Sequence, residues 1–454
     1  MLSSEVKQTD YAPRYKVSAV DVLAELKKYM LVDGYDFVLD LDNSKGANFI
    51  EARTGKRYLD FFTCFASMPI GMNHPKLLDE GFRKYINRAA TNKVSNSDIY
   101  TDVMATFVKT FFEIAVPKTF KYSFFISGGA LAVENALKAA FDWKVRKNLK
   151  NKKTKGELGH QIIHFKQAFH GRSGYTMSLT NTDPNKVLYY PKFNWPRVSN
   201  PYITFPLDDK SLEDLIKREK QSIEEMKAAF KNNPNDIAGI IIEPIQGEGG
   251  DHHFRPEFFK QMRQLADENE ALLIFDEVQT GLGITGTMWA HEQLGITPDI
   301  MCFGKKMQIC GIVATDRLDE VSDNVFRTSS RINSTWGGNL TDMARSTRYL
   351  EIIDEENLLE NVKQLGKELD DGLMKIQNDY PELISNTRGM GLFRAFDFKK
   401  ELRADFIKKC FEEGLMILPC GTTSVRFRPP LNLKKNQLEE GIAIVRKVID
   451  KLKK

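Results

Sequence analysis

The chain of 454 residues has little of the cysteine, the long apolar segments or the one-sided charge that mark several classes of protein. Its five cysteines are scattered and odd in number, which fits reduced thiols and argues against a disulfide framework. No apolar run reaches the ~18–20 residues that a membrane-spanning helix needs. Lys and Arg (65) nearly balance Asp and Glu (61), so strong attraction to nucleic acid or to acidic membranes is not expected.

The first twenty residues also lack the positive flank and apolar stretch of a secretion signal, so we expect a cytoplasmic protein. Low-complexity segments and tandem repeats are absent. Hydrophobic residues make up 42% of the chain, which is ample material for a large folded core. Disordered, secreted, membrane-spanning and fibrous proteins are therefore excluded by the sequence pattern.

The middle of the chain alternates short apolar runs with longer amphipathic ones. The short runs are rich in Ile, Leu and Phe, as expected of strands that are buried on both faces. They occupy residues 122–126, 161–165, 237–242, 271–275 and 299–303. Helical patterns lie between several of them, and this alternation predicts an α/β fold with a mostly parallel sheet covered by helices.

The pattern changes near residue 343, where a long helical stretch (344–377) precedes a smaller α+β unit. We therefore predict three segments. Residues 1–75 contribute a helix and short strands to a small domain, residues 76–342 form the large domain, and residues 343–454 form the C-terminal small domain. No Pro-, Gly- or Ser-rich linker separates them, so we expect packed domains.

One segment, GLGITG (281–286), matches the glycine spacing of dinucleotide-binding loops. In those loops the first glycine follows a strand directly. Here five residues intervene, among them Asp276 and Glu277, whose charges would repel a pyrophosphate. A nicotinamide or flavin site is therefore disfavoured.

Histidine pairs give no better case for a metal. His160 and His164 have i,i+4 spacing, but His164 lies within the predicted strand 161–165, which turns the pair away from a common helix face. His252 and His253 have no cysteine or acid at ligand spacing. We predict no structural metal.

The informative residues follow the predicted strands directly. In an open parallel sheet, ligands bind outside the carboxyl ends of the strands. Small residues there let backbone N–H groups approach a phosphate at a helix N-terminus. The strand ends carry SGGA (127–130), KQAFHGR (166–172), EPIQGEGG (243–250), DEVQTG (276–281) and GKK (304–306). Their convergence predicts a site with a phosphate cradle, an aromatic ring, an arginine, acids and a lysine.

These segments resemble class-III pyridoxal-phosphate aminotransferases, in order, over roughly residues 30 to 450. The motifs that carry the resemblance are SGGALAVENALK, AFHGRSGY, IIIEPIQGEGG, IFDEVQTGLGITG, FGKK, STWGGN and RGMGLFRAF. Within the class, AFHGRSGYTMSLTNTDP, FGKKMQICG and LPCGTTSVRFRPPL are most similar to the L-lysine 6-aminotransferase branch. The 4-aminobutyrate branch is the next most similar. The resemblance implies fold type I, aspartate-aminotransferase-like, and a homodimer with shared active sites.

The resemblance also implies the cofactor, pyridoxal 5′-phosphate, and the residues that serve it. Lys305 would bind the cofactor covalently and later carry a proton; its neighbour Lys306 is the alternative. Asp276 would pair with the ring nitrogen and keep it protonated. Gln279 would face the phenolic oxygen, and Phe169 would stack on the ring.

Further residues complete the cofactor site in this resemblance. The turn of Gly128, Gly129 and Ala130 would hold the phosphate, and Thr335 would reach the phosphate of the neighbouring subunit. His170 and Glu243 would support the site.

The same resemblance implies transfer of the ε-amino group of L-lysine to 2-oxoglutarate. Arg172 would bind the distant carboxylate of lysine, and Arg426 the α-carboxylate of 2-oxoglutarate. Glu248 would neutralise Arg426 while lysine is bound. Gln279 and Thr335 are also counted among the substrate-binding residues. The alternatives are another ω-aminotransferase, acting on ornithine or 4-aminobutyrate, and a non-catalytic binding protein with the same fold.

Overall fold

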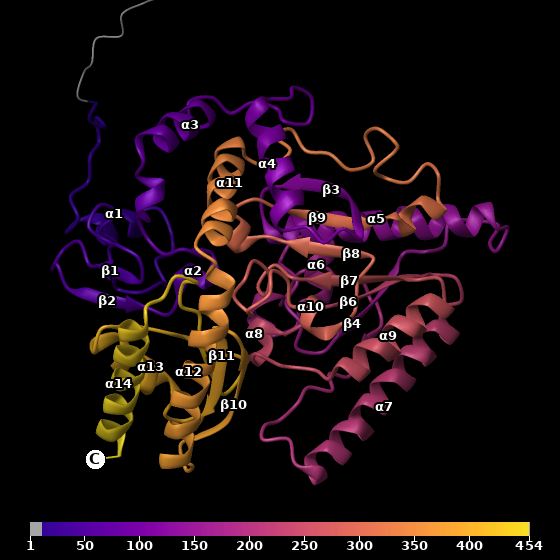
Figure 1. Cartoon of the computed structure of the whole chain (residues 1–454). Coiled ribbons are helices and arrows are strands. Elements are labelled where there is room, and N and C mark those ends of the chain that lie inside the picture. Colours follow the sequence, from indigo (N-terminus) through magenta and orange to yellow (C-terminus); the bar gives the residue numbers. More distant parts are fainter. Residues whose placement is uncertain (1–10, 454) are drawn as a thin grey trace, which may run out of the picture.

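The computed structural model describes residues 11–453, whose strands form three sheets. Figure 1 shows a central sheet enclosed by helices, with both ends of the described chain on one flank. The central sheet has the order β3 (Phe120–Ile126), β9 (Cys310–Thr315), β8 (Ile300–Phe303), β7 (Leu272–Asp276), β6 (Ile237–Ile242), β4 (Gln161–Phe165) and β5 (Arg197–Val198).

Neighbouring strands from β5 to β8 run parallel, which confirms the prediction of a mostly parallel sheet. All five apolar runs found in the sequence are strands of this sheet, to within two residues at each end. Only β9 is reversed, because it pairs antiparallel with both β3 and β8. The carboxyl ends of β4, β6, β7 and β8 therefore meet at one edge.

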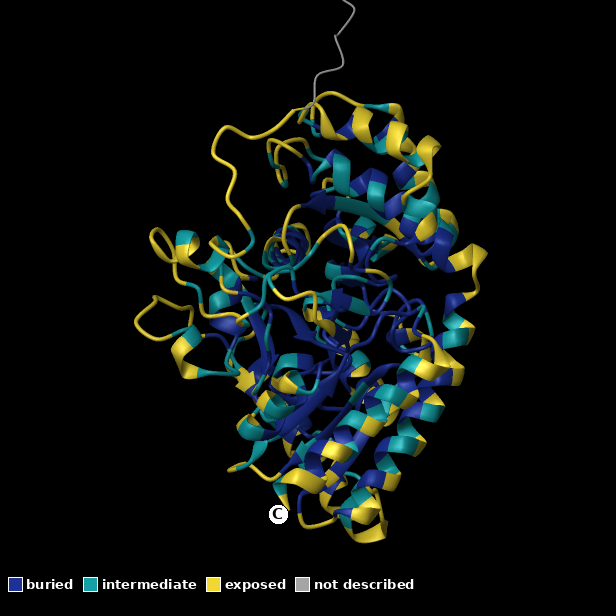
Figure 2. Ribbon diagram, turned by 90° about the vertical axis from the view of Figure 1, so that its left-hand side faces the viewer, coloured by how far each residue is buried: buried dark blue, intermediate teal, exposed yellow. Residues whose placement is uncertain are grey.

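Helices cover both faces of the central sheet. On β7, Ile274 packs in the same apolar cluster as Trp143 of α5 (Gly129–Lys150). Its neighbour Leu273 packs with Phe258 of α9 (Pro256–Glu268), and α7 (Asp209–Asn232) completes that second layer. Successive side chains of a strand point to opposite faces, so an unbroken apolar run is what a doubly covered strand requires. Figure 2 shows the result, with buried strands inside and exposed residues on the outer surfaces of the helices.

A second group of helices packs beside β3 and β9. It consists of α3 (Glu80–Ala90), α4 (Asp102–Ile114) and α11 (Leu340–Glu355), with α11 packed against the other two. Asp79, Thr101 and Asn339 cap these three helices by accepting a backbone N–H. The short helices are α1 (Val22–Lys27), α2 (Thr63–Ala66), α6 (Gly174–Leu179), α8 (Gly247–Gly250) and α10 (His291–Leu294).

The C-terminal part forms a four-stranded antiparallel sheet. Its order is β10 (Ile384–Met390), β11 (Phe393–Phe398), β14 (Ser424–Phe427) and β13 (Leu418–Cys420). The helices of this part are α12 (Leu358–Asp379), α13 (Arg403–Glu412) and α14 (Lys435–Leu452). The long helical stretch predicted over 344–377 is two helices, because Asn357 adopts φ 48° and separates α11 from α12.

The two ends of the chain share the third sheet. In it, β2 (Arg57–Asp60) pairs antiparallel with β1 (Asn48–Ile50) and parallel with β12 (Leu415–Met416). The rings of Tyr35 and Phe411 also stack, with centroids 5.1 Å apart. The predicted α+β character of the smaller part is confirmed, and the domain limits at residues 75 and 342 stay predictions.

Within residues 11–453, none of the helices combines the length and the apolar character needed to cross a membrane.

Candidate active site

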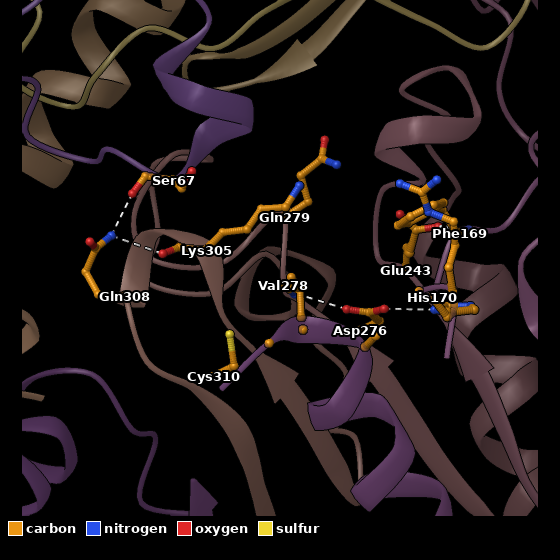
Figure 3. Close-up of a pocket in the computed structure, with 15 residues that line it drawn as sticks. Ser67, Phe169, His170, Glu243, Asp276, Val278, Gln279, Lys305, Gln308 and Cys310 are labelled. Atoms are coloured by element: carbon orange, nitrogen blue, oxygen red, sulfur yellow. Dashed lines mark hydrogen bonds and ion pairs between the residues drawn. The ribbon is translucent and has the colours of Figure 1, made fainter. Parts of the chain in front are cut away.

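A cavity of about 610 Å³ lies where strands of the central sheet end (Figure 3). Its wall comes from the segments that follow β3, β4, β6, β7 and β8. It brings together nine of the predicted site residues, namely Gly128, Gly129, Ala130, Phe169, Arg172, Glu243, Asp276, Gln279 and Lys305. The other lining residues are Ser67, His170, Gly171, Val278, Gln308 and Cys310.

The turn between β3 and α5 forms one wall of the cavity. Gly128 has φ 108°, and a Cβ built there would meet no atom within 4 Å, so the space before the turn is open. Gly128 also precedes α5 without a side-chain cap, which leaves the first N–H groups of that helix available. Gly171 (φ 118°) closes against this turn, because its Cβ would lie only 2.5 Å from the Cβ of Ala130. A helix start of this kind binds phosphate.

Asp276 and His170 form a buried pair on another wall. Asp276 ends β7, and its Oδ2 lies 2.8 Å from Nδ1 of His170 (Figure 3). Its Oδ1 accepts a hydrogen bond of 3.1 Å from the backbone N–H of Val278. Both side chains are buried. The carboxylate is thus fixed at the cavity wall, where it suits a protonated ring nitrogen.

Glu243 supports the segment that carries Phe169. One carboxylate oxygen accepts the N–H of Phe169 at 3.0 Å, and the other accepts the N–H of Gly247 at 3.1 Å. Burial, and next the charge of Asp276, raise the pKa of Glu243 well above its usual value. Glu243 therefore joins two strand-end loops of the cavity wall.

Lys305 and Lys306 lie differently, although they are neighbours. Lys305 lines the cavity, with φ 49° directly after β8 and Gly304. Burial, and then the charges of Arg426 and Arg428, lower the pKa of Lys305 to about 8. Lys306 is buried elsewhere, and its Nζ donates to the backbone oxygen of Gln279 at 2.6 Å. Only Lys305 of the two presents an amine to the cavity.

Arg426 lies in β14 and is not among the residues that line the cavity. Its Nη2 lies 3.0 Å from Oε2 of Glu248, which belongs to α8. Its Nη1 lies 3.5 Å from Oε1 of Gln279. The Arg426 side chain is 4% exposed, whereas that of Glu248 is 27% exposed. The two predicted partners thus form an ion pair beside the cavity.

Two further predicted residues lie apart from this pair. Arg172 lines the cavity and is exposed, and its guanidinium makes no hydrogen bond or ion pair with the part of the chain that the structure describes. Thr335 is exposed and does not line the cavity of its own chain. The roles of both residues stay predictions.

Sequence reasoning missed several residues of this region. Ser67 comes from the N-terminal part, and its backbone oxygen accepts a hydrogen bond of 2.7 Å from Nε2 of Gln308. Lys186 donates to Oε1 of Glu248 at 2.6 Å. Asp251 pairs with Arg428 at 2.5 Å. None of them belongs to a local motif, so no signal in the sequence separated them from ordinary loop residues.

The donor set fits pyridoxal 5′-phosphate. An uncapped helix start suits its phosphate, a fixed carboxylate suits its ring nitrogen, and an amine with a lowered pKa suits its aldehyde. Nε2 of His170, on the ring that contacts Asp276, is buried and has no hydrogen-bond partner within residues 11–453. This polar atom would need a partner from outside those residues.

Comparison with known proteins agrees with this geometry. The family model for class-III aminotransferases matches residues 30–449. The chain is 50% identical to the L-lysine-epsilon aminotransferase of Mycobacterium tuberculosis over 93% of its own length and 94% of that protein. It is 46% identical to the L-lysine-epsilon aminotransferase of Streptomyces clavuligerus, with 95% of each chain covered. It is 30% identical to mouse mitochondrial 4-aminobutyrate aminotransferase, over 90% of this chain and 84% of that protein.

Solved structures show the same relationship. The lysine aminotransferase from M. tuberculosis in the internal aldimine form superposes with a TM-score of 0.94 at 49% identity, covering 96% of this chain and 100% of that one. Ornithine aminotransferase from Toxoplasma gondii superposes with a TM-score of 0.76 at 22% identity, covering 97% of this chain and 96% of that one. The second likeness concerns the fold alone.

Proposed function

The chain belongs to the class-III aminotransferases, and from that premise we propose that it transfers the ε-amino group of L-lysine to 2-oxoglutarate. The products are 2-aminoadipate 6-semialdehyde, which cyclises spontaneously, and L-glutamate. Relatives named for lysine at 46–50% identity support this donor over the 4-aminobutyrate donor of a relative at 30% identity. The fold is that of the fold-type I enzymes, as the sequence motifs predict.

The cofactor is pyridoxal 5′-phosphate. When bound, it supplies an aldehyde that accepts the amino group and a ring that withdraws electrons from the reacting carbon. The backbone of Gly128, Gly129 and Ala130 would hold the phosphate. Asp276, fixed by His170, would keep a proton on the ring nitrogen. Phe169 and Gln279 would contact the ring and its phenolic oxygen.

Lys305 is the proposed acid and base of the reaction. Its lowered pKa, about 8, keeps part of the amine neutral near neutral pH and able to act as a nucleophile. Nζ of Lys305 would accept the proton that leaves the reacting carbon of lysine. In the return half-reaction the same atom would move the proton in the opposite direction.

The observation that carries the substrate proposal is the ion pair of Arg426 with Glu248. Lysine places its carboxylate several methylenes from the reacting carbon, where Arg172 would bind it. Arg426 would then face only methylenes, and Glu248 neutralises its charge. For 2-oxoglutarate, Glu248 would move aside so that Arg426 binds the α-carboxylate. One site thereby serves two substrates of different charge.

An absorbance spectrum of the holoenzyme tests the reaction. L-Lysine without a keto acid should remove the absorbance band of the cofactor bound to Lys305, and 2-oxoglutarate should restore it. A band that ignores lysine but responds to ornithine or 4-aminobutyrate would overturn the donor. Absence of any band after addition of pyridoxal phosphate would contradict the whole proposal.

The charge switch has its own test. Glu248→Ala should slow the lysine half-reaction by at least about tenfold, because Arg426 loses its carboxylate. The 2-oxoglutarate half-reaction should lose less. Glu248→Gln, which keeps the size of the side chain, separates the effect of charge from that of space. Equal losses in both half-reactions would contradict the switch.

We further propose a cytoplasmic homodimer, active in lysine breakdown, in which Thr335 serves the neighbouring site. Mixing a Lys305→Ala variant with a Thr335→Ala variant tests the sharing of sites. Each hybrid dimer would contain one site with both defects and one site with neither. Activity above that of either parent is expected, and its absence would place Thr335 in its own subunit's site.

A further inference from the structure

Glu248 has a second cationic partner besides Arg426. Nζ of Lys186 lies 2.6 Å from Oε1 of Glu248, whereas Arg426 lies 3.0 Å from Oε2. Each carboxylate oxygen therefore has its own cation. Nζ of Lys186 also lies 5.3 Å from the ring centroid of Phe169, which lines the cavity. Lys186 thus stands at the edge of the site.

The local sequence fixes the position of Lys186. It is the last residue of η2 (Pro184–Lys186), a single turn of 3₁₀ helix in the loop that follows α6. The side chain of Asp183 caps this turn by accepting the N–H of Asn185 at 3.0 Å, and Pro184 occupies its first position. The Lys186 side chain is 22% exposed, so it is partly open to solvent while it contacts Glu248.

We propose that Lys186 holds the carboxylate of Glu248 when Arg426 turns to a dicarboxylate substrate, and that it thereby sets how readily the site accepts 2-oxoglutarate. This inference rests on the proposed function and names a positioning residue for its second half-reaction. Lys186 acts through Glu248 and is not a catalytic residue.

The charges around Glu248 explain why a second cation matters. Burial by itself raises the pKa of Glu248, but the charges of Arg426 and Lys186 outweigh burial and lower the pKa below its usual value. Glu248 is therefore a carboxylate at neutral pH. If Arg426 binds the substrate instead, a Glu248 without Lys186 would be a largely desolvated charge with no partner. With Lys186, Oε2 can leave Arg426 while Oε1 keeps its contact.

Lys186 also weakens the pair that has to open. Two cations share one carboxylate, so Arg426 receives only part of its charge. Without Lys186 the carboxylate would turn fully to Arg426 and tighten that pair. Loss of Lys186 would therefore leave Glu248 without a partner after the pair opens and would make the pair harder to open. Both effects would weaken the binding of 2-oxoglutarate. The lysine half-reaction, in which Glu248 stays on Arg426, depends on Lys186 much less.

The test compares three variants of the holoenzyme. Lys186→Met removes the ammonium and keeps a side chain of similar length, and Lys186→Arg keeps the charge. Lys155→Met removes an exposed charge that makes no ion pair with the described residues, and it serves as the control for net charge. Two quantities are measured for each variant. They are the rate of each half-reaction from the absorbance band at a series of substrate concentrations, which gives the KM, and the affinity for glutarate, a dicarboxylate without a reacting carbonyl, by calorimetry.

Lys186→Met should raise the KM for 2-oxoglutarate and the Kd for glutarate about tenfold, the size expected for one charge-assisted hydrogen bond. The lysine half-reaction should change less than about threefold. Lys186→Arg should restore most of the loss, and Lys155→Met should behave as wild type. Equal losses in both half-reactions, or an unchanged Kd for glutarate, would overturn the proposal.

A double variant shows whether Lys186 acts through Glu248. In a Glu248→Ala background, Lys186→Met should change the Kd for glutarate less than about twofold. A persistent tenfold effect would mean that Lys186 binds the dicarboxylate directly, which contradicts the positioning role. Failure of the proposed function gives a different result, because L-lysine would then leave the absorbance band of the wild-type holoenzyme unchanged. A wild type that binds no glutarate would overturn the role of Lys186.

Discussion

Replacing Lys305 by methionine should stabilise the cofactor-free protein, although it abolishes activity. The pKa of Lys305 is lowered from 10.5 to about 8, mainly because the ammonium is desolvated and lies near Arg426 and Arg428. Between these two values the unfolded chain binds more protons at this residue than the folded chain does. Folding therefore becomes more favourable as the pH rises from 8 to 10.5. Below pH 8 the folded protein carries the full free-energy penalty of burying the Lys305 ammonium.

The magnitude follows from the size of the shift. A shift of about 2.5 units corresponds to about 3 kcal/mol of unfolding free energy at pH 7. At pH 9.5 most unfolded chains still carry the proton but few folded ones do, and the remaining penalty is about 1 kcal/mol. Lys305→Met removes the penalty at both pH values. Its advantage over the wild type should therefore shrink by about 2 kcal/mol between pH 7 and pH 9.5.

Urea unfolding of both cofactor-free proteins at the two pH values measures this difference. Groups that titrate alike in the two proteins cancel in the comparison, and any change in packing caused by methionine does not depend on pH. Lys155→Met changes an exposed position, so its unfolding free energy should differ from that of the wild type by the same amount at both pH values. A pH-independent difference between wild type and Lys305→Met would refute the reasoning, because it would mean that Lys305 keeps an ordinary pKa in the folded state.

Two further substitutions test the surroundings of the site. Asp251→Asn should cost roughly 3–5 kcal/mol of unfolding free energy in urea, because Arg428 would keep a buried charge without its partner. Asp33→Asn at an exposed position is the control, and a loss below about 1 kcal/mol for Asp251→Asn would contradict the prediction. Gly247→Ala would place a Cβ 2.1 Å from Oε1 of Gln279 and displace that side chain. The Kd for pyridoxal phosphate, measured by fluorescence titration, should rise about two- to tenfold with unfolding of the cofactor-free protein unchanged, whereas an unchanged Kd would exclude Gln279 from cofactor binding.

Most of the central sheet could be predicted because buried strands have a local signature. Residues 237–242 are apolar throughout and match β6 residue for residue. The prediction omitted two strands of this sheet, the two-residue β5 and β9. β9 is buried along most of its length, and its direction follows from chain length. Only six residues separate Phe303 from Cys310, whereas a parallel crossover needs about a dozen or more. The helical stretch is divided at Asn357 because this one residue adopts a left-handed conformation. The spacing of apolar residues does not predict such a conformation.

The site divides in the same way. Residues at or just after the ends of strands, such as Asp276 and Lys305, can be predicted to lie together because the ends of parallel strands meet at one edge. Lys186 follows an Asp-Pro turn, which in sequence is typical of an exposed loop. Its partner Glu248 lies 62 positions further along the chain, and only the completed fold brings the two together. Contacts of this kind have no period and no motif, so sequence patterns do not reveal them.

The three buried arginines of the C-terminal part, Arg388, Arg426 and Arg428, differ in how their charges are paired within the described residues. Arg428 is paired with Asp251, and both side chains are only 1% exposed, so neither can leave without burying a lone charge. Arg388 is paired with Asp397 at 3.0 Å and also donates to the hydroxyl of Ser424 at 2.6 Å.

Arg426 differs from both. Its carboxylate partner within residues 11–453 is Glu248, the most exposed of the three partner acids at 27%. Glu248 is also bonded to a second cation, Lys186. If this pair opens, Lys186 still balances the charge of Glu248, and Arg426 becomes available to a substrate carboxylate. Asp251 and Asp397 have no second cation of this kind among the described residues. The arrangement of charges therefore supports the proposal that Arg426, and not Arg388 or Arg428, binds the acceptor substrate.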